Sequence, residues 1–184
     1  SFSKINLSLR INKKLKNGLH DIQSYFCLIN LYDKIMIKKA KGKKDKVKFV
    51  GEFANDVKRK NNSVLKVLSL LRKNKILSNY YSIIVQKKIP VFAGLGGGTS
   101  NAYSLFRYFN KGKFKKDLNN KFFKEIGSDF ELFKHKQAFL ENLKVVNNFK
   151  KKFKLNFLLV YPYIKCSTKM IYSKVDKYSL KSKL

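Results

Sequence analysis

The sequence predicts an α+β fold, in which strands and helices follow one another without regular alternation. Apolar and polar residues alternate over residues 5–11, which is the period of half-buried strands, and further extended stretches follow up to residue 50. From residue 62 the apolar residues recur at the three-and-four spacing of an amphipathic helix. A glycine-rich loop then joins a further strand to a further helix. With 184 residues, the chain can form one well-buried core and part of a second.

The first predicted elements are strands. Apolar and polar residues alternate strictly over residues 5–11. A second extended stretch covers residues 22–29, and short strands are expected at residues 35–37 and 47–50, around a lysine-rich loop. The opening quarter of the chain is therefore predicted to be mostly sheet.

The middle of the chain is predicted to run from helix to strand to helix. The first helix begins near Asn62, because the apolar residues that follow lie on one face. Strand alternation returns over residues 81–89, and Pro90 ends it. The glycine loop follows directly. The next apolar stripe predicts a helix that starts near Thr99 or Ser100, either of which can cap its first turn.

The last part of the chain is predicted to be mostly helical before a final strand. Residues 114–147 are rich in lysine and helical in pattern, with a break at residues 127–129, Gly-Ser-Asp. Residues 153–161 form a further apolar stretch that we expect to be a strand. No internal repeat is visible.

The composition excludes several classes of protein. A hydrophobic fraction of 44% excludes a disordered chain, and no run of about 18 apolar residues exists to span a bilayer. Cys27 and Cys166 lack the Cys-x-x-Cys or Cys/His spacing of a zinc site and do not form a disulfide framework. No charged-then-apolar leader follows Ser1, so we expect no signal peptide, no membrane partner and a cytoplasmic location.

The formal net charge is +31, a basic excess of the kind that accompanies nucleic-acid binding. Only four of the 42 basic residues are arginines, however. Because proteins that read phosphates and bases favour the bidentate arginine fork, we expect no specific nucleic-acid partner. A noncatalytic protein that binds polyanions in a salt-dependent manner is the alternative to an enzyme.

The glycine loop over residues 94–100, Gly-Leu-Gly-Gly-Gly-Thr-Ser, has the ingredients of an anion site. Glycines permit positive φ angles and close approach of the backbone, and a helix amino terminus offers unpaired N–H groups. The loop lacks the Gly-Lys-Ser/Thr of the Walker motif, and Thr99 and Asn101 fall where the dinucleotide fingerprint needs its last glycine. A triphosphate would fit this loop, whereas a glycine-rich turn at a helix start is the purely structural alternative.

Several segments together resemble a known family. Residues 90–101, Pro-Val-Phe-Ala-Gly-Leu-Gly-Gly-Gly-Thr-Ser-Asn, are similar to the central ATP-binding motif of the GHMP kinase superfamily (galactokinase, homoserine kinase, mevalonate kinase, phosphomevalonate kinase). Residues 3–7, Ser-Lys-Ile-Asn-Leu, and residues 18–20, Gly-Leu-His, followed by Gln23, narrow the resemblance. With the triple glycine before Thr99, these motifs resemble the 4-diphosphocytidyl-2-C-methyl-D-erythritol kinases of the non-mevalonate isoprenoid pathway, in the family's order.

The resemblance implies a GHMP kinase fold, with two domains and an ATP site. Residues 1–154 would form the amino-terminal ATP-binding domain, whose sheet and helices are of the ribosomal-protein-S5-domain-2-like type. Residues 155–184 would begin a carboxy-terminal α/β domain, which is truncated because the family continues beyond this point. ATP and Mg²⁺ are the implied cofactors. The implied ATP-binding residues are Asn62, Pro90, Val91, Phe92, Ala93, Gly94, Leu95, Gly96, Gly97, Gly98, Thr99 and Ser100.

The resemblance also implies a catalytic pair, because Lys4 and Asp129 match the family's lysine and aspartate by position in the motifs. An aspartate can accept or orient the proton of a substrate hydroxyl, and an ammonium can stabilise the aspartate and the transferring phosphoryl group. No dedicated metal ligand can be placed. Ser100 is the best candidate, since a hydroxyl there could reach an ion that bridges the phosphates.

The implied substrate is a small cytidyl compound, and the implied reaction is transfer of the γ-phosphate of ATP to its 2-hydroxyl. His20 and Tyr172 match family positions that contact the cytosine, and Asn6 lies on the same face of the first strand as Lys4. Leu19 stands where the family usually has a tyrosine. Another GHMP-type kinase, acting on mevalonate or homoserine, is the alternative enzyme, and in that case His20 and Tyr172 would make no cytosine contact.

Overall fold

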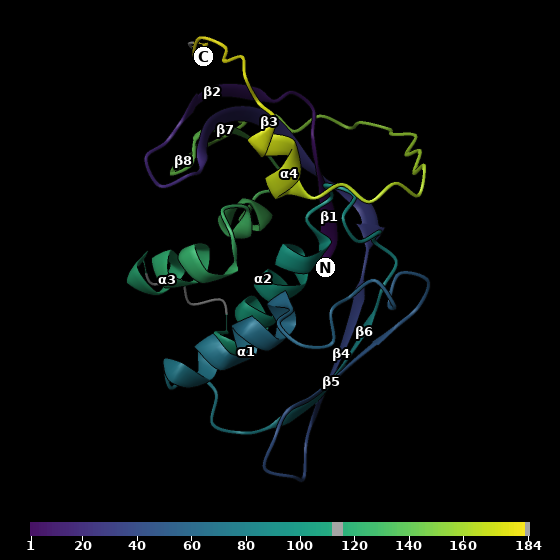
Figure 1. Ribbon diagram of the computed structural model, residues 1–184. Helices are drawn as coiled ribbons and strands as arrows, with labels where there is room; N and C mark the ends of the chain where they lie inside the picture. Colours follow the sequence, from purple (N-terminus) through teal and green to yellow (C-terminus); the bar gives the residue numbers. More distant parts are fainter. Residues whose placement is uncertain (112–115, 183–184) are drawn as a thin grey trace.

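The computed structural model describes residues 1–111 and 116–182, and it has two sheets that flank a group of helices (Figure 1). The larger sheet is antiparallel throughout, and β3 lies at its centre with β1 and β2 on one edge and β7 on the other, followed by β8. Its strands are β1 (Phe2–Asn6), β2 (Arg10–Lys14), β3 (His20–Tyr32), β7 (Gln137–Asn142) and β8 (Val145–Asn148).

The smaller sheet continues directly from β3. Its central strand β6 (Tyr81–Gln86) pairs antiparallel with β4 (Lys34–Lys39) and parallel with β5 (Lys46–Val50). The predicted strands of the opening quarter are thus confirmed, although the first alternating stretch is split at residues 7–9 into β1 and β2.

Two of the helices, at residues 63–73 and 97–109, cover one face of the smaller sheet (Figure 1). Leu71 on one helix and Phe106 on the next pack with Ile83 and Val85 of β6, and all four side chains are fully buried. Burying one such side chain contributes about 1.5–3 kcal/mol. The helices are α1 (Ser63–Lys73), α2 (Gly97–Phe109), α3 (Lys116–Ile126), the 3₁₀ helix η1 (Phe130–Lys134) and α4 (Thr168–Ser173).

The predicted helical character of residues 114–147 is wrong for its last part. Helix α3 ends at Ile126 and η1 at Lys134, and residues 137–148 form the hairpin of β7 and β8. Ala138, Phe139 and Leu140 are three consecutive buried apolar residues. Such a short apolar run is compatible with a helix or a strand. Here it forms a strand, because β7 pairs with the edge of β3.

The strand predicted over residues 153–161 is also wrong. This stretch has no regular secondary structure and pairs with no strand among the described residues. Leu158 and Val160 are 91% and 81% exposed. An apolar strand forms only where a second strand pairs with its backbone, and among the described residues this segment has only the Gln137 side chain bonded to the Phe153 backbone.

Helix α2 begins earlier than predicted. Gly96 is its N-cap in a left-handed conformation (φ 68°), and no side chain caps it. Thr99 and Ser100 therefore lie within the first turn and do not precede it. In the part of the chain that the structure describes, no helix is long and apolar enough to cross a bilayer.

Candidate active site

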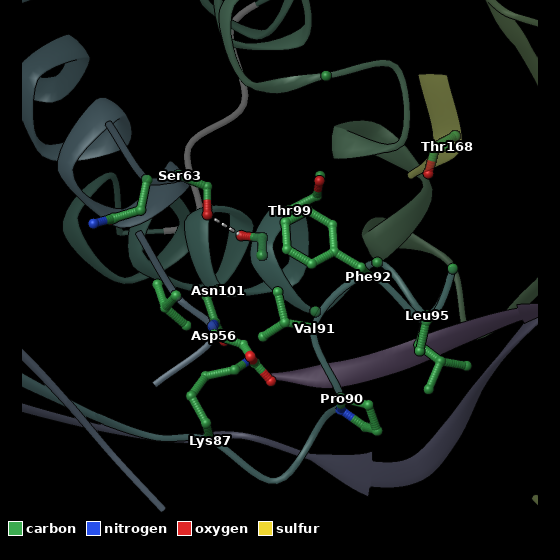
Figure 2. Close-up of a pocket in the computed structure, with 18 of the residues that line it drawn as sticks. Asp56, Ser63, Lys87, Pro90, Val91, Phe92, Leu95, Thr99, Asn101 and Thr168 are labelled. Atoms are coloured by element: carbon green, nitrogen blue, oxygen red, sulfur yellow. Dashed lines mark hydrogen bonds between the residues drawn. The ribbon is translucent and has the colours of Figure 1, made fainter. Parts of the chain in front are cut away.

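A cavity of about 540 Å³ lies at the strand-to-helix junction (Figure 2). One wall is the glycine loop, from Pro90 to Thr99, and another is the start of α1. Residues 127–129 and Thr168 complete the lining on the side toward α4. Every predicted ATP-binding residue lines this cavity except Ser100.

Backbone contacts hold the glycine loop in place. The Lys4 N–H of β1 donates to the Leu95 carbonyl at 2.9 Å, and the Ser63 hydroxyl donates to the Gly98 carbonyl at 2.6 Å. Gly96 has positive φ, and a β-carbon there would lie 2.9 Å from the Phe133 ring. Glycine is therefore required at this position by both conformation and space.

The amino terminus of α2 points its free N–H groups at the loop. The first helical hydrogen bond runs from the Ser100 N–H to the Gly96 carbonyl at 2.9 Å. The N–H groups of Gly97, Gly98 and Thr99 consequently have no partner within the helix. Unpaired N–H groups at the positive end of a helix dipole form an anion site, and all three residues line the cavity.

Ser100 does not face this cavity, contrary to its predicted place. Its hydroxyl donates to the Phe2 carbonyl at 2.6 Å and accepts from the Ser1 hydroxyl at 2.7 Å. The side chain is buried between α2 and β1, because α2 docks with this face on β1. Thr99, one position earlier, lies in the cavity wall and near Gly127. Of these two adjacent hydroxyl residues, Thr99 lines the cavity and Ser100 does not.

Asn62 lines the same cavity and also caps α1. Its side-chain oxygen accepts from the Leu65 N–H at 3.0 Å, and its amide donates to the Lys58 carbonyl at 3.0 Å. Capping by asparagine stabilises a helix start by about 1 kcal/mol. The cap therefore fixes the wall that faces the glycine loop.

A second cavity, of about 670 Å³, adjoins the first. It brings together the predicted substrate residues Asn6, His20 and Tyr172 with Lys4, and exposed Leu19 lies on its rim. Ala93, Gly94, Ser128, Asp129, Cys166 and Thr168 line both cavities.

Lys4 and Asp129 meet where the two cavities join. The Lys4 ammonium lies 3.3 Å from an Asp129 carboxylate oxygen and donates to the Asn6 side-chain oxygen at 3.0 Å. The Lys4 side chain is only 4% exposed, whereas that of Asp129 is 34% exposed. A buried cation thus stands behind a carboxylate that is open to both cavities. The Ser24 hydroxyl lies 3.1 Å from the same Asn6 oxygen and 2.6 Å from the Ser8 carbonyl oxygen.

The aromatic wall of the second cavity is formed by β3 and α4, which lie side by side (Figure 1). The rings of His20 and Tyr172 are 5.1 Å apart between centroids. Burial and then the charge of Asp129 raise the pKa of Tyr172 above its ordinary value. Tyr172 therefore presents a neutral phenol close to the carboxylate.

Comparison with known proteins identifies the family. The chain is 41% identical over 184 residues to the 4-diphosphocytidyl-2-C-methyl-D-erythritol kinase of Pelagibacter ubique. The aligned region covers 97% of this chain and 65% of that protein. It is 34% identical over 185 residues to the enzyme of the same name from Ureaplasma parvum. This aligned region covers 97% of this chain and 69% of that protein. The chain belongs to the 4-diphosphocytidyl-2-C-methyl-D-erythritol kinase family. No family model matches it.

Solved structures agree on the fold. A 4-(cytidine 5'-diphospho)-2C-methyl-D-erythritol kinase superposes with a TM-score of 0.57 at 21% identity, over 76% of this chain and 49% of that one. Homoserine kinase from Cytophaga hutchinsonii superposes with a TM-score of 0.52 at 12% identity, over 79% of this chain and 50% of that one. The predicted α+β GHMP kinase fold is thereby confirmed. The chain spans about two thirds of the length of the family members named above.

The sequence analysis did not single out several residues of the candidate site. Lys87, Ser63 and Asn101 all line the first cavity. Lys87 carried no signal, because it is one of many lysines in the chain. Ser63 and Asn101 directly follow predicted site residues, so adjacency to Asn62 and Ser100 was the signal that could have found them.

Proposed function

We propose that this chain is an ATP-dependent kinase that phosphorylates the 2-hydroxyl of 4-diphosphocytidyl-2-C-methyl-D-erythritol, in non-mevalonate isoprenoid precursor biosynthesis. The observation that supports this function is the position of Asp129, which lines both cavities. One cavity carries an anion site of backbone N–H groups, and the other carries an aromatic wall. A group bound in the first could therefore pass to an acceptor in the second beside Asp129.

The first cavity would hold ATP. The N–H groups of Gly97, Gly98 and Thr99 would bind its phosphates, as unpaired groups at helix starts do. The start of α1, with Asn62, would face the adenosine, because it lines the same cavity across from the loop.

The oxygen groups of the protein at this site would bind Mg²⁺ only together with the phosphates of a nucleotide. Among the described residues no three His, Cys, Asp or Glu side chains gather to hold a metal ion. Mg²⁺ commonly binds through one or two protein oxygens and substrate phosphates. The Thr99 hydroxyl and the Asp129 carboxylate, both in the wall of the first cavity, are the groups that would hold it. When bound, the ion would neutralise phosphate charge.

Asp129 would accept or orient the proton of the acceptor hydroxyl. Its partly exposed carboxylate can reach a substrate in the second cavity. The ammonium of buried Lys4 lies 3.3 Å from one of the carboxylate oxygens. The ammonium would stabilise the carboxylate and the negative charge on the transferring phosphoryl group. Asn6 orients that ammonium through its 3.0 Å hydrogen bond.

The second cavity would bind the cytidyl group. The ring of Tyr172 offers an apolar face, and His20 beside it offers ring nitrogens to a base. Leu19, 41% exposed on the rim, would make an apolar contact in place of the family's usual tyrosine.

The domain division proposed for this function is residues 1–154 and 155–184. Regular structure of the two sheets ends at Asn148, and the following segment to residue 166 has neither helix nor strand. A cytoplasmic location, where ATP and magnesium are available, is part of the same proposal.

Phosphate transfer from ATP with magnesium tests the function. The chain is offered 4-diphosphocytidyl-2-C-methyl-D-erythritol, mevalonate or homoserine separately, and the phosphorylated product is identified by mass spectrometry. We expect phosphorylation of the cytidyl substrate alone. Transfer only to mevalonate or homoserine would assign another GHMP-type activity.

A second arm tests the noncatalytic alternative. Binding of ATP is compared with binding of inorganic polyphosphate at low and moderate salt. A kinase binds ATP saturably and selectively, whereas a polyanion-binding protein binds both in steep dependence on salt. Salt-sensitive binding without nucleotide preference, together with no transfer, would overturn the proposed function.

A further inference from the structure

A buried cluster of charged and polar side chains lies beneath the glycine loop. Asp33, Lys87 and Asn101 are 0%, 3% and 2% exposed. One Asp33 oxygen accepts from the N–H groups of Lys88 at 2.8 Å and Ile89 at 2.9 Å. The other accepts from the Lys87 ammonium and from the Asn101 amide, the latter at 3.0 Å. A single carboxylate thus satisfies four donors.

This cluster joins three elements that build the nucleotide cavity. Asp33 lies between β3 and β4, Lys87 follows β6, and Asn101 is in the first turns of α2. The carboxylate therefore ties the sheet to the segment that enters the glycine loop and to the helix that leaves it. Charge-assisted hydrogen bonds of this kind are about twice as strong as neutral ones.

Two members of the cluster also reach the cavity. Lys87 and Asn101 line it, whereas Asp33 does not. Figure 2 shows the Lys87 side chain directed toward Asn101 at one end of the cavity. A β-carbon at Gly97 would lie 3.3 Å from the Lys87 ammonium, so this cation lies beside Gly97, whose N–H group belongs to the anion site.

Asn101 carries an unused acceptor at this place. Its side-chain oxygen is buried and has no hydrogen-bond partner among the described residues. Buried polar atoms are nearly always paired, so this oxygen is a hydrogen-bonding group of the cluster that the described residues leave unpaired.

The charge of Lys87 is costly to keep at this position. Burial lowers the pKa of Lys87, and the charge and hydrogen bond of Asp33 act in the opposite direction. A buried ion pair is often no more stabilising than apolar residues of similar size. An anion bound in the cavity would give this cation a second partner besides Asp33.

We propose that Asp33 is a positioning residue for nucleotide binding, which holds the Lys87 ammonium beside the amino terminus of α2, where it adds its positive charge to the anion site. The inference rests on the proposed function, since the anion is taken to be a nucleoside polyphosphate. Lys87 is then a binding residue, and Asp33 acts through it.

Binding of ADP with Mg²⁺ is measured by calorimetry, and melting temperature is measured in parallel, for four variants of the full chain. Lys87→Met should bind about tenfold to hundredfold more weakly. Asp33→Asn leaves a buried ammonium without its counter-ion and should lower the melting temperature by roughly 10 °C. The double variant Asp33→Asn/Lys87→Met should regain most of the melting temperature but bind as weakly as Lys87→Met. Lys34→Met, an exposed lysine beside Asp33, controls for loss of charge and should bind as the wild type does.

The double variant separates positioning from structure. If it binds ADP within twofold of the wild type, the cluster is structural and the inference is overturned. Wild-type affinity in Lys87→Met would overturn it equally. Phosphoryl transfer is assayed in the same preparations. If the wild type transfers phosphate but the double variant binds ADP with unaltered affinity, only this inference is overturned. If the variants show the expected ADP affinities but the wild type transfers no phosphate, only the proposed function is overturned. A wild-type chain that binds no ADP overturns both.

Discussion

The first cavity, at the glycine loop, and the carboxy-terminal segment, residues 149–182, are built in different ways. The cavity stands on a continuous core of helices and sheet, and its loop is held by a backbone hydrogen bond from β1 and a side-chain hydrogen bond from Ser63 of α1. The carboxy-terminal segment exposes large apolar side chains, with Leu158 at 91% and Leu180 at 92%. Yet this segment supplies Cys166, Thr168 and Tyr172 to the cavity walls.

The carboxy-terminal segment is held by a few polar contacts and aromatic ring contacts. The Cys166 N–H donates to the Phe92 carbonyl at 2.8 Å, and the Lys165 ammonium lies 2.6 Å from an Asp56 oxygen. Farther on, the Gln23 side chain makes two hydrogen bonds with the backbone of Ser182. A segment can thus line a site without contributing a core, so stability and function should respond to different substitutions in the two regions.

The largest difference is expected in stability. Phe106 is fully buried against Phe122 and Phe130, and Phe106→Ala should lower the free energy of unfolding by about 3–5 kcal/mol. Leu158→Ala in the carboxy-terminal segment should change it by less than about 0.5 kcal/mol. Urea denaturation measures both. Equal losses would mean that the carboxy-terminal segment shares the core.

A steric block of the glycine loop should separate binding from folding. A β-carbon at Gly97 would lie 2.9 Å from the Ile89 side chain, so Gly97→Val should destabilise the protein by about 1–3 kcal/mol. It should weaken ATP binding at least about tenfold. Gly42→Val is the matched control, because no atom lies within 4 Å of a β-carbon there. Titration with ATP and a thermal melt test the pair, and unchanged ATP affinity in Gly97→Val would place the nucleotide elsewhere.

The two thiols report on the two regions separately. Cys27 lies in the core sheet, 1% exposed, and burial raises its pKa. Cys166 is partly exposed and lines both cavities. An aromatic disulfide reagent should therefore modify Cys166 in the folded protein and Cys27 only on unfolding, because the thiolate is the reactive form. Bound ATP should slow the first reaction. The variant Cys166→Ser identifies which thiol reacts, and fast modification in that variant would contradict the assignment.

The smallest effect is expected in the titration of Tyr172. Burial first, and the Asp129 charge second, raise its pKa above the ordinary value of 10.0. The neutral phenol therefore adds stability that is fully present below about pH 10 and is lost as the pH rises through the raised pKa. Asp129→Asn removes the second cause, so the pKa should fall part of the way back. Ultraviolet difference titration against Tyr172→Phe measures this change, and an unchanged pKa would mean that Asp129 and Tyr172 do not share one cavity.

Local patterns predicted much of the fold. The strand alternation around β6, the apolar stripe of α1 and the glycine loop between strand and helix are all properties of neighbouring residues, and the structure confirms them. Residues 137–148 escaped prediction because their partner, β3, lies more than a hundred residues away in the sequence. Segment 153–161 escaped because apolar composition alone cannot say whether a pairing strand exists.

The candidate site was less visible than the fold. Lys4 and Asp129 came from motif positions and not from any property of those residues. Thr99 and Ser100 are adjacent hydroxyls about 100° apart around α2, so which one faces the cavity depends on how the helix docks on β1. Lys87 is marked only by its buried contact with Asp33, which depends on the tertiary fold.

The central claim is that phosphoryl transfer crosses from one cavity to the other at Asp129. Single-turnover transfer from ATP to 4-diphosphocytidyl-2-C-methyl-D-erythritol by Asp129→Asn tests it most directly. ADP affinity is measured on the same protein without magnesium, and Asp176→Asn, an exposed aspartate, is the control. We predict transfer about 100-fold to 10,000-fold slower in Asp129→Asn, with ADP affinity retained and with Asp176→Asn unaffected. Transfer by Asp129→Asn at the wild-type rate would contradict the claim.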